Sequence, residues 1–260
     1  MCLVRHATNI VCIMNISRKA DNKRVGSQLA FSSFMYSKYI KRPLDFLLSL
    51  CAIIILSPLL LLLTIVGAIK MKGNPFFTQL RPGKDEKIFR LIKFRTMTCE
   101  TDADGNPLPD EQRLVPYGRF LRSTSLDELP ELFNILKGDM AIVGPRPLLV
   151  RDMVFMTPEQ RKRHTVRQGL TGLAQISGRN AMTWEDKLDY DLKYVQNIDF
   201  FTDCFIILMT FYKVFKRDGI TEEGQATAMD LGDYLLASGM VHKEEYVSLQ
   251  KEAKHLIEKY

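Results

Sequence analysis

Cysteine and histidine are scarce in this chain of 260 residues and are scattered along it. The five cysteines include no CxxC pair, and the four histidines do not combine with them in a zinc-binding spacing. An odd number of cysteines, one of which lies inside an apolar run, is typical of free thiols in a reducing compartment. The sequence therefore argues against a disulfide-stabilised secreted domain and against a zinc site.

Fingerprints of nucleotide-binding and nucleic-acid-binding proteins are missing as well. The glycine-rich stretch 169–180 lacks the spacing of a P-loop or a dinucleotide motif. The chain carries a formal net charge of +6, but residues 35–100 alone hold eleven Lys and Arg against four acids, a net charge of +7. Because this excess lies beside an apolar run, we expect anionic lipid headgroups or phosphorylated substrates as partners, and no nucleic acid.

The longest stretch without a charge runs from Phe46 to Ile69. Its 24 residues, at about 1.5 Å per residue, would cross a bilayer core of about 30 Å as one straight helix. Ser57-Pro58 interrupts it near the middle, and a proline inside a helix costs about 3 kcal/mol or bends the helix. The segment is therefore either a re-entrant hairpin or a kinked spanning helix.

Basic residues on both sides of this stretch bear on that choice. Lys38, Lys41 and Arg42 precede it, and Lys70 and Lys72 follow it. Cationic flanks tend to remain on the cytoplasmic side, so the symmetry favours a hairpin that returns to the leaflet it left. Prolines are tolerated in spanning helices, which keeps the kinked alternative open.

The remaining sequence is organised around this apolar stretch. The tail has mixed charges and no catalytic motif. We predict a disordered leader over 1–34, or a start of translation at Met35. A membrane helix over 35–72, broken at Ser57-Pro58, is followed by a cytosolic domain over 73–220. Residues 221–260 are predicted to form a linker and a helical tail that is broken near Ser238-Gly239.

Two β-prone runs open the cytosolic domain. Phe76–Leu80 and Ile88–Phe94 flank a Pro-Gly turn at 82–83, which predicts a β-hairpin. Alternation along the second run places Lys93 on the face opposite to Arg90. A strand face exposed to solvent would show the same pattern.

An apolar, aromatic segment closes this domain at Phe200–Lys216. Its longest charge-free run, Cys204–Tyr212, has nine residues and is too short to span a bilayer. It is either a helix lying in the membrane interface, which we favour, or an ordinary core helix. The fold class that we predict is α+β, mostly helical with a small β-hairpin.

Two acids lie together in the segment 122–149. Ser125 and Glu128 have the spacing of a capping box, whereas Pro130 favours a helix that starts nearer to residue 130. Either way, Asp127 and Glu128 lie at a helix N-terminus, which attracts phosphate and lowers the pKa of a carboxylate. Either the two acids serve only to cap the helix, or an ionised Asp127 acts as a nucleophile toward phosphorus.

Two arginines follow: Arg146 lies between prolines, and Arg179 lies at the end of a glycine-rich stretch. Gly144-Pro145-Arg146-Pro147 fixes the backbone on both sides of Arg146. This is either a rigid turn with an exposed arginine or a preorganised guanidinium for a diphosphate. The glycines of 169–180 permit close backbone approach and precede Arg179.

These motifs, taken together, resemble the bacterial sugar transferases, the small monotopic phosphoglycosyl transferases. The resemblance covers about Met35 to Thr227, and the leader and the tail depart from it. It rests on KRPLDF, the apolar run broken by Ser57-Pro58, FTQLRPG, IFRLIKFRTM, SLDELPELFNILKGDMAIVGPRPLL, GLTGLAQISGRN and EGQAT, in that order.

The resemblance implies a monotopic membrane protein with a re-entrant helix and a magnesium-dependent transfer in two steps. Asp127 matches the nucleophile that attacks the β-phosphorus of a UDP-sugar and releases UMP, and it is also the residue expected to hold Mg²⁺. Glu128 is expected to assist as a base or through the metal. The phosphate pocket of the family matches Lys93, Arg122, Arg146 and Arg179.

The resemblance also implies the partners and the place of action. The substrates are a UDP-sugar and undecaprenyl phosphate, met among the lipids of the cytoplasmic leaflet of a bacterial inner membrane. The closest likeness within the family is to transfer of N,N′-diacetylbacillosamine 1-phosphate, with glucose or galactose 1-phosphate for exopolysaccharide or O-antigen as the alternative. A non-catalytic membrane scaffold is the alternative from another class. Further copies of the chain, or downstream glycosyltransferases, are conceivable partners.

Overall fold

The computed structural model describes residues 32–178, 182–216 and 229–260. The fold is α+β, as predicted: helices surround two separate two-stranded sheets. In chain order the elements are η1 (Tyr36–Ile40), α3 (Lys41–Lys70), β1 (Phe76–Pro82), η2 (Lys84–Glu86), β2 (Ile88–Phe94), α4 (Asp110–Arg113), α5 (Pro116–Ser123), η3 (Leu126–Glu128), α6 (Glu131–Lys137), β3 (Met140–Val143), α7 (Val150–Met153), α8 (Pro158–Arg161), η4 (Lys162–Thr165), β4 (Gln168–Thr171), α9 (Leu173–Ser177), α10 (Trp184–Gln196), α11 (Phe200–Lys216), α12 (Leu231–Ala237) and α13 (Lys243–Glu258).

Most of the predicted leader lies outside the described residues. The described part of it, 32–34, is helical and leads without a break through η1 into α3. The prediction of disorder is therefore wrong for these three residues.

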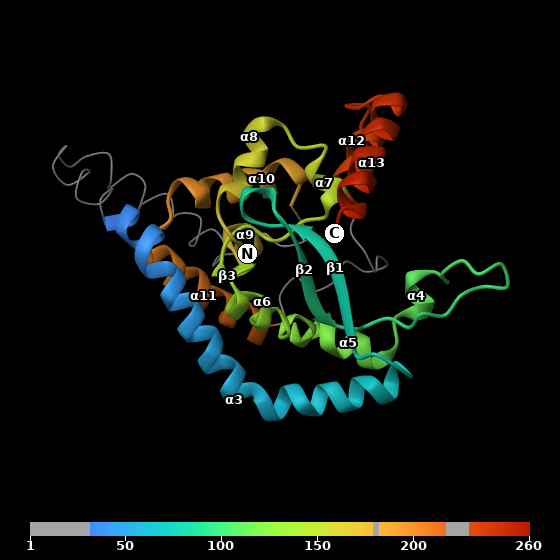
Figure 1. Ribbon diagram of the computed structural model, residues 1–260, viewed down its shortest axis with the longest axis horizontal. Coiled ribbons are helices and arrows are strands. Elements are labelled where there is room, and N and C mark those ends of the chain that lie inside the picture. Colours follow the sequence, from blue (N-terminus) through green and yellow to red (C-terminus); the bar gives the residue numbers. More distant parts are fainter. Residues whose placement is uncertain (1–31, 179–181, 217–228) are drawn as a thin grey trace.

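The helix α3 bends but does not break. Pro58 lies inside it, and Figure 1 shows a sharp change of direction partway along the helix. Pro58 has no N–H to donate to the carbonyl of Ile54, four residues earlier. The hydroxyl of Ser57 donates a hydrogen bond of 2.8 Å to that carbonyl instead. The predicted interruption at Ser57-Pro58 is thus a bend in one continuous helix.

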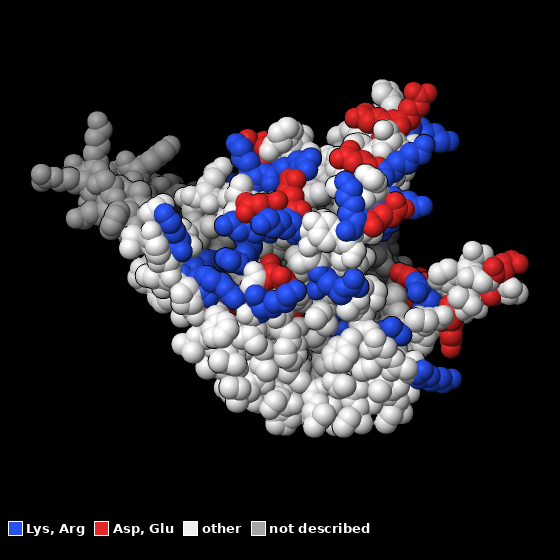
Figure 2. Space-filling model, viewed as in Figure 1, with Lys and Arg blue, Asp and Glu red and all other residues white. Residues whose placement is uncertain are grey.

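Much of α3 is apolar and exposed. Ile55 is 74% exposed and Ile69 is 69% exposed, and this is the one described helix that is long and apolar enough to cross a membrane. In Figure 2 the lower end of the molecule, where α3 runs in Figure 1, is white except for cations at its right-hand edge, and basic side chains border it above. A soluble domain would bury such a surface.

The second arm of α3 also packs against elements that follow it in the chain. Leu60 and Leu63 pack with Phe94 of β2 and with Leu121 of α5 in one buried cluster. The hydroxyl of Tyr117 on α5 donates a hydrogen bond of 2.9 Å to the carbonyl of Leu63. The bent helix is therefore fixed to the hairpin and to α5.

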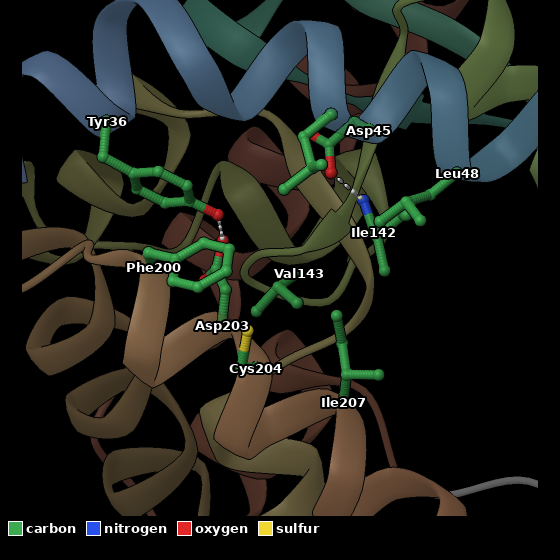
Figure 3. A pocket seen from close by; sticks show the side chains of 10 residues that line it. Tyr36, Asp45, Leu48, Ile142, Val143, Phe200, Asp203, Cys204 and Ile207 are labelled. Atoms are coloured by element: carbon green, nitrogen blue, oxygen red, sulfur yellow. Dashed lines mark hydrogen bonds between the residues drawn. The ribbon is translucent and has the colours of Figure 1, made fainter.

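The first arm of α3 is joined to α11 through a buried carboxylate. Asp203 on α11 accepts hydrogen bonds from the Tyr36 hydroxyl at 2.6 Å and from Lys41 Nζ at 2.5 Å. Asp45 on α3 accepts a bond of 3.1 Å from the backbone N–H of Ile142 on β3. Figure 3 shows Tyr36, Asp45 and Asp203 at a cavity between the two helices, which has a volume of about 250 Å³. The contacts fix the two apolar helices to the same sheet.

The predicted hairpin is present. β1 and β2 pair antiparallel, with Phe76 opposite Phe94 and Arg81 opposite Phe89. Phe89 and Leu91 are buried in the core on one face of the hairpin, and Lys93 continues that face. Arg90 is exposed on the other face, as the alternation predicted.

A second sheet, which the sequence did not predict, pairs β3 and β4 in parallel. The strands are four residues each and are joined through 24 intervening positions, which include several short helices. The backbones of Gly144 and Gly169 lie so close together that a side chain would not fit between them. A Cβ on Gly169 would lie 2.1 Å from the Gly144 nitrogen. This sheet fixes the start of the Gly-Pro-Arg-Pro turn.

The tail forms two helices, α12 and α13, as predicted. They are separated near Gly239, which has a positive φ of 70°. The backbone N–H of Leu231 donates a bond of 3.0 Å to Asp152 on α7, and α13 packs on the same helix. The tail is therefore part of the folded unit in Figure 1.

Candidate active site

Lys93 projects from β2 into a cluster of acids. Its Nζ lies 2.7 Å from Oε1 of Glu128 and 3.0 Å from Oε1 of Glu131. Burial acts to lower the pKa of Lys93, but the two carboxylates outweigh it and the pKa is raised. Lys93 therefore carries its charge at neutral pH.

Asp127 and Glu128 lie on η3, one short turn before α6. Ser125 precedes this turn in a left-handed conformation, with a φ of 56°, and its side chain makes no capping bond. The predicted capping box is therefore wrong, because a residue in this conformation turns its side chain away from the helix that follows. α6 starts at Glu131 after Pro130, which confirms the prediction of a later start.

Glu128 is held by two cations. Oε1 accepts from Lys93 at 2.7 Å and from the Arg146 guanidinium at 2.6 Å. Burial acts to raise the pKa of Glu128, but the charges of Arg146 and Lys93 lower it well below its usual range. Glu128 also raises the pKa of Arg146. Glu128 is therefore an ionised anchor for the two basic side chains.

Asp127 is placed differently from its neighbour. Within the described residues its carboxylate accepts no hydrogen bond and forms no ion pair. Burial and the adjacent Glu128 raise its pKa to about 6, against the lowering effect of Lys93, Arg146 and Arg122. The predicted lowering by a helix N-terminus is wrong, because desolvation and a like charge outweigh the weak dipole of one short turn.

The other predicted phosphate ligands differ in how well they are placed. Arg122 on α5 donates from Nε to the Thr96 hydroxyl at 3.1 Å, and its charge acts on Asp127. Arg179 lies outside the described residues. The structure thus brings Lys93, Glu128 and Arg146 into contact, with Asp127 and Arg122 beside them.

Glu131 was missed by the sequence analysis. It is 2% exposed and shares Lys93 with Glu128. Burial raises its pKa to about 7; Lys93 opposes this effect and Glu128 adds to it. The spacing of three residues from Glu128 was a signal, because residues three apart share one side of a helical turn.

Support for Arg146 comes from a buried ion pair that was also missed. Arg163 donates from its guanidinium to the Arg146 carbonyl at 2.6 Å and to Asp191 at 2.8 Å. Arg163 and Asp191 are fully or almost fully buried. On the other side, Gly169 donates a bond of 2.8 Å to the Pro145 carbonyl. The turn is therefore rigid, and the Arg146 side chain remains 44% exposed.

The acids fit a magnesium ion that binds together with a substrate. Among the described residues, no group of three or more His, Cys, Asp or Glu is arranged to hold a metal. Mg²⁺ usually takes one or two carboxylates and completes its shell with water and substrate phosphates. Asp127, whose carboxylate accepts no hydrogen bond from the described residues, would provide such a carboxylate.

Known proteins resemble this chain over most of its length. The family model described as bacterial sugar transferase matches residues 36–217. The uncharacterised sugar transferase EpsL of Bacillus subtilis is 46% identical over 189 residues, which cover 73% of this chain and 94% of that protein.

Two relatives have names that specify a reaction. The UDP-glucose:undecaprenyl-phosphate glucose-1-phosphate transferase of Klebsiella pneumoniae is 38% identical over 67% of this chain. The undecaprenyl-phosphate galactose phosphotransferase of Salmonella typhimurium is 34% identical over 75% of it. The chain spans only 40% and 44% of these longer proteins.

Proposed function

This chain belongs to the bacterial sugar transferase family and is a transferase, and from that premise we propose that it moves a sugar 1-phosphate from a UDP-sugar to undecaprenyl phosphate and releases UMP. The observation that carries the proposal is the contrast between two neighbouring acids. Glu128 is held between Lys93 and Arg146, whereas no hydrogen bond or ion pair from the described residues occupies the carboxylate of Asp127.

The first step that we propose is an attack by Asp127 on the β-phosphorus of the donor. A carboxylate oxygen forms a bond to phosphorus, and the bond from phosphorus to the bridging oxygen breaks, so that UMP leaves with the electron pair. The sugar phosphate is then an acyl phosphate on Asp127. With a pKa of about 6, Asp127 is mostly ionised at neutral pH. Its negative charge is stabilised less than that of an exposed carboxylate, which favours reaction of the ionised form.

The second step transfers the group to the lipid. A phosphate oxygen of undecaprenyl phosphate attacks the same phosphorus, the acyl phosphate bond breaks, and Asp127 is restored. A phosphate monoester has a second pKa of about 6, so its nucleophilic oxygen needs little help from a base at neutral pH. The low pKa of Glu128 therefore fits an orienting role for this residue, which holds Lys93 and Arg146 toward the phosphates.

Mg²⁺ held by Asp127 and the substrate phosphates would supply further positive charge to offset the repulsion between anionic reactants. Lys93 and Arg146 contribute fixed charges at the same place.

We place the enzyme at the cytoplasmic face of the inner membrane, with α3 as a re-entrant anchor and α11 in the interface. Two features support this placement. Both flanks of α3 are basic, and α11 exposes Phe201, Leu208 and Phe211 at 75%, 68% and 60%. Both arms of the bent helix are fixed to the rest of the fold, and an anchor of this shape would hold the reacting acid at headgroup height, where the lipid phosphate lies.

The sugar is proposed on the names of the relatives. These names include glucose, galactose and N-acetylgalactosamine. They favour a hexose or N-acetylhexosamine 1-phosphate for exopolysaccharide or O-antigen over N,N′-diacetylbacillosamine 1-phosphate, the sugar that the sequence analysis preferred.

Release of UMP tests this function. The full chain in detergent or nanodiscs is supplied with undecaprenyl phosphate, Mg²⁺ and one UDP-sugar at a time. We expect UMP with one donor or a small set of donors, loss of UMP on addition of EDTA, and none from Asp127→Asn. A chain that binds the membrane but releases no UMP from any donor would instead be a scaffold.

A further inference from the structure

A small cavity is lined by the two cations that contact Glu128, Lys93 and Arg146. Its volume is about 80 Å³, and its walls hold three cations and one carboxylate. The charged lining residues are Arg81, Lys93, Arg146 and Glu131, and the apolar ones are Leu91, Pro147 and Leu148. The cavity thus extends the predicted phosphate pocket to a residue that the motifs did not single out, Arg81.

The hairpin places Arg81 next to the predicted phosphate ligands. Arg81 pairs with Phe89 and Phe77 pairs with Lys93, so Arg81 and Lys93 lie on the same face of the two strands. Arg90, by contrast, is exposed on the opposite face. Two arginines of one hairpin therefore have different surroundings, one in the cavity and one in solvent.

Arg81 is oriented by neutral groups only. One terminal nitrogen donates to the Pro147 carbonyl at 3.2 Å and the other to Oε1 of Gln79 at 2.6 Å. The Nε atom is buried and has no hydrogen-bond partner. The guanidinium is thus held in place while one of its donors is unused.

The charge of Arg81 is also uncompensated at close range. Lys93 and Arg146 each have a carboxylate within 3 Å, but among the described residues no carboxylate forms an ion pair with Arg81. Burial and Arg146 lower the pKa of Arg81 to about 10, against the opposing effect of Asp152, Glu131 and Asp230, none of which forms an ion pair with it, so Arg81 is still a cation at neutral pH. A partly buried cation without a counter-ion is unfavourable unless an anion binds beside it.

We propose that Arg81, together with Lys93 and Arg146, forms a subsite for a phosphate group of a substrate. The subsite rests on the function proposed above and adds a binding residue to it. The ligand is a phosphate oxyanion, which can come from the nucleotide diphosphate or from the lipid phosphate. The unused Nε–H and the charge of Arg81 are what it contributes.

The test compares Arg81→Gln with Arg90→Gln in the full chain. KM is measured for the UDP-sugar and for undecaprenyl phosphate, each with the other substrate saturating. Losing one charge-assisted hydrogen bond predicts a rise in KM of roughly 10- to 100-fold for Arg81→Gln. Arg90→Gln should leave both constants unchanged. A rise for the UDP-sugar alone assigns the nucleotide phosphates, a rise for the lipid alone assigns the lipid phosphate, and a rise for both assigns a shared subsite.

A purely structural role of Arg81 gives a different result. It predicts a lower thermal unfolding midpoint and a lower kcat, with both KM values unchanged. That outcome, or a variant identical to wild type, overturns the subsite. Arg81→Lys, which keeps the charge, should recover part of the loss in KM. UMP release by the wild type is measured alongside, because its absence would contradict the proposed function and not the subsite.

Discussion

Arg146 and Glu128 form an ion pair in which a guanidinium nitrogen lies 2.6 Å from Oε1 of the carboxylate. Lys93 completes the clamp on the same oxygen. Burial and the charge of Glu128 raise the pKa of the neighbouring Asp127 to about 6, although Lys93 and Arg146 act to lower it. In the proposed function these two adjacent acids have separate tasks: Glu128 orients the cations and Asp127 reacts.

The pH dependence of the rate should follow the ionisation of Asp127. The reactive form is the carboxylate, so kcat/KM should fall as the pH drops through about 6. Glu128→Gln removes the negative charge that helps to raise the pKa of Asp127, and the acidic limb should therefore move to lower pH while kcat falls. A pH–rate profile of both proteins measures this, and an unmoved limb in the variant would assign the titration to another group.

Asp127→Asn should stabilise the fold at neutral pH. The pKa of Asp127 is raised on folding, so the folded state binds its proton more tightly, and ionisation above about pH 6 costs stability. A neutral side chain avoids this cost, which is at most about 3 kcal/mol for a shift of about two units. The gain in unfolding midpoint should be present at pH 7.5 and should shrink toward pH 4. A variant less stable than wild type at pH 7.5 would contradict the assignment.

Asp191→Asn should destabilise the enzyme and slow it. The substitution leaves the Arg163 guanidinium buried without its counter-ion, which typically costs about 3–5 kcal/mol. It also loosens the contact from Arg163 to the Arg146 carbonyl. The matched control is Glu159→Gln, since the Glu159–Lys162 pair is 59% exposed on both sides and should contribute little. Denaturant unfolding under one condition compares the stability of the two variants. Equal unfolding midpoints would show that the buried Arg163–Asp191 pair does not stabilise the fold.

Pro58→Leu should straighten α3 and change its topology. Leucine restores the N–H that bonds to the Ile54 carbonyl and removes the cause of the bend. In a background without native cysteines, single cysteines at Ser37 and Lys72 should react from the same side of the membrane in the parent chain. In Pro58→Leu they should react from opposite sides.

Ser57→Ala provides the control for that experiment. It removes the hydroxyl bond to Ile54, worth about 1 kcal/mol, but keeps the proline. Labelling should therefore match the parent chain. Opposite-side labelling in the parent itself would mean that α3 spans the membrane.

Local patterns in the sequence were enough to predict several parts of the structure. The β-hairpin follows from two alternating runs and a Pro-Gly turn, and the later start of α6 follows from Pro130. Asp127 and Glu128 were singled out as two acids at a helix N-terminus, and Arg146 was singled out because glycine and proline fix the backbone around it. Each of these signals lies within a few residues of the feature that it predicts.

Features that depend on distant residues were not predicted. The parallel pair of β3 and β4 is short and has no alternation to reveal it. Nothing local marks Asp191 as the partner of Arg163, 28 positions away. The pKa of Asp127 was predicted in the wrong direction because it depends on burial, which appears only once the domain is folded around it.

Trapping of the covalent intermediate tests the central proposal most directly. The purified chain is mixed with a UDP-sugar that carries a radiolabel in its sugar, in the absence of undecaprenyl phosphate, and is then quenched in denaturant. The account predicts label on the protein in an amount matched by UMP, its release on addition of undecaprenyl phosphate, and no label on Asp127→Asn. Turnover by wild type that never leaves label on the protein, with kinetics that require both substrates bound together, would contradict it.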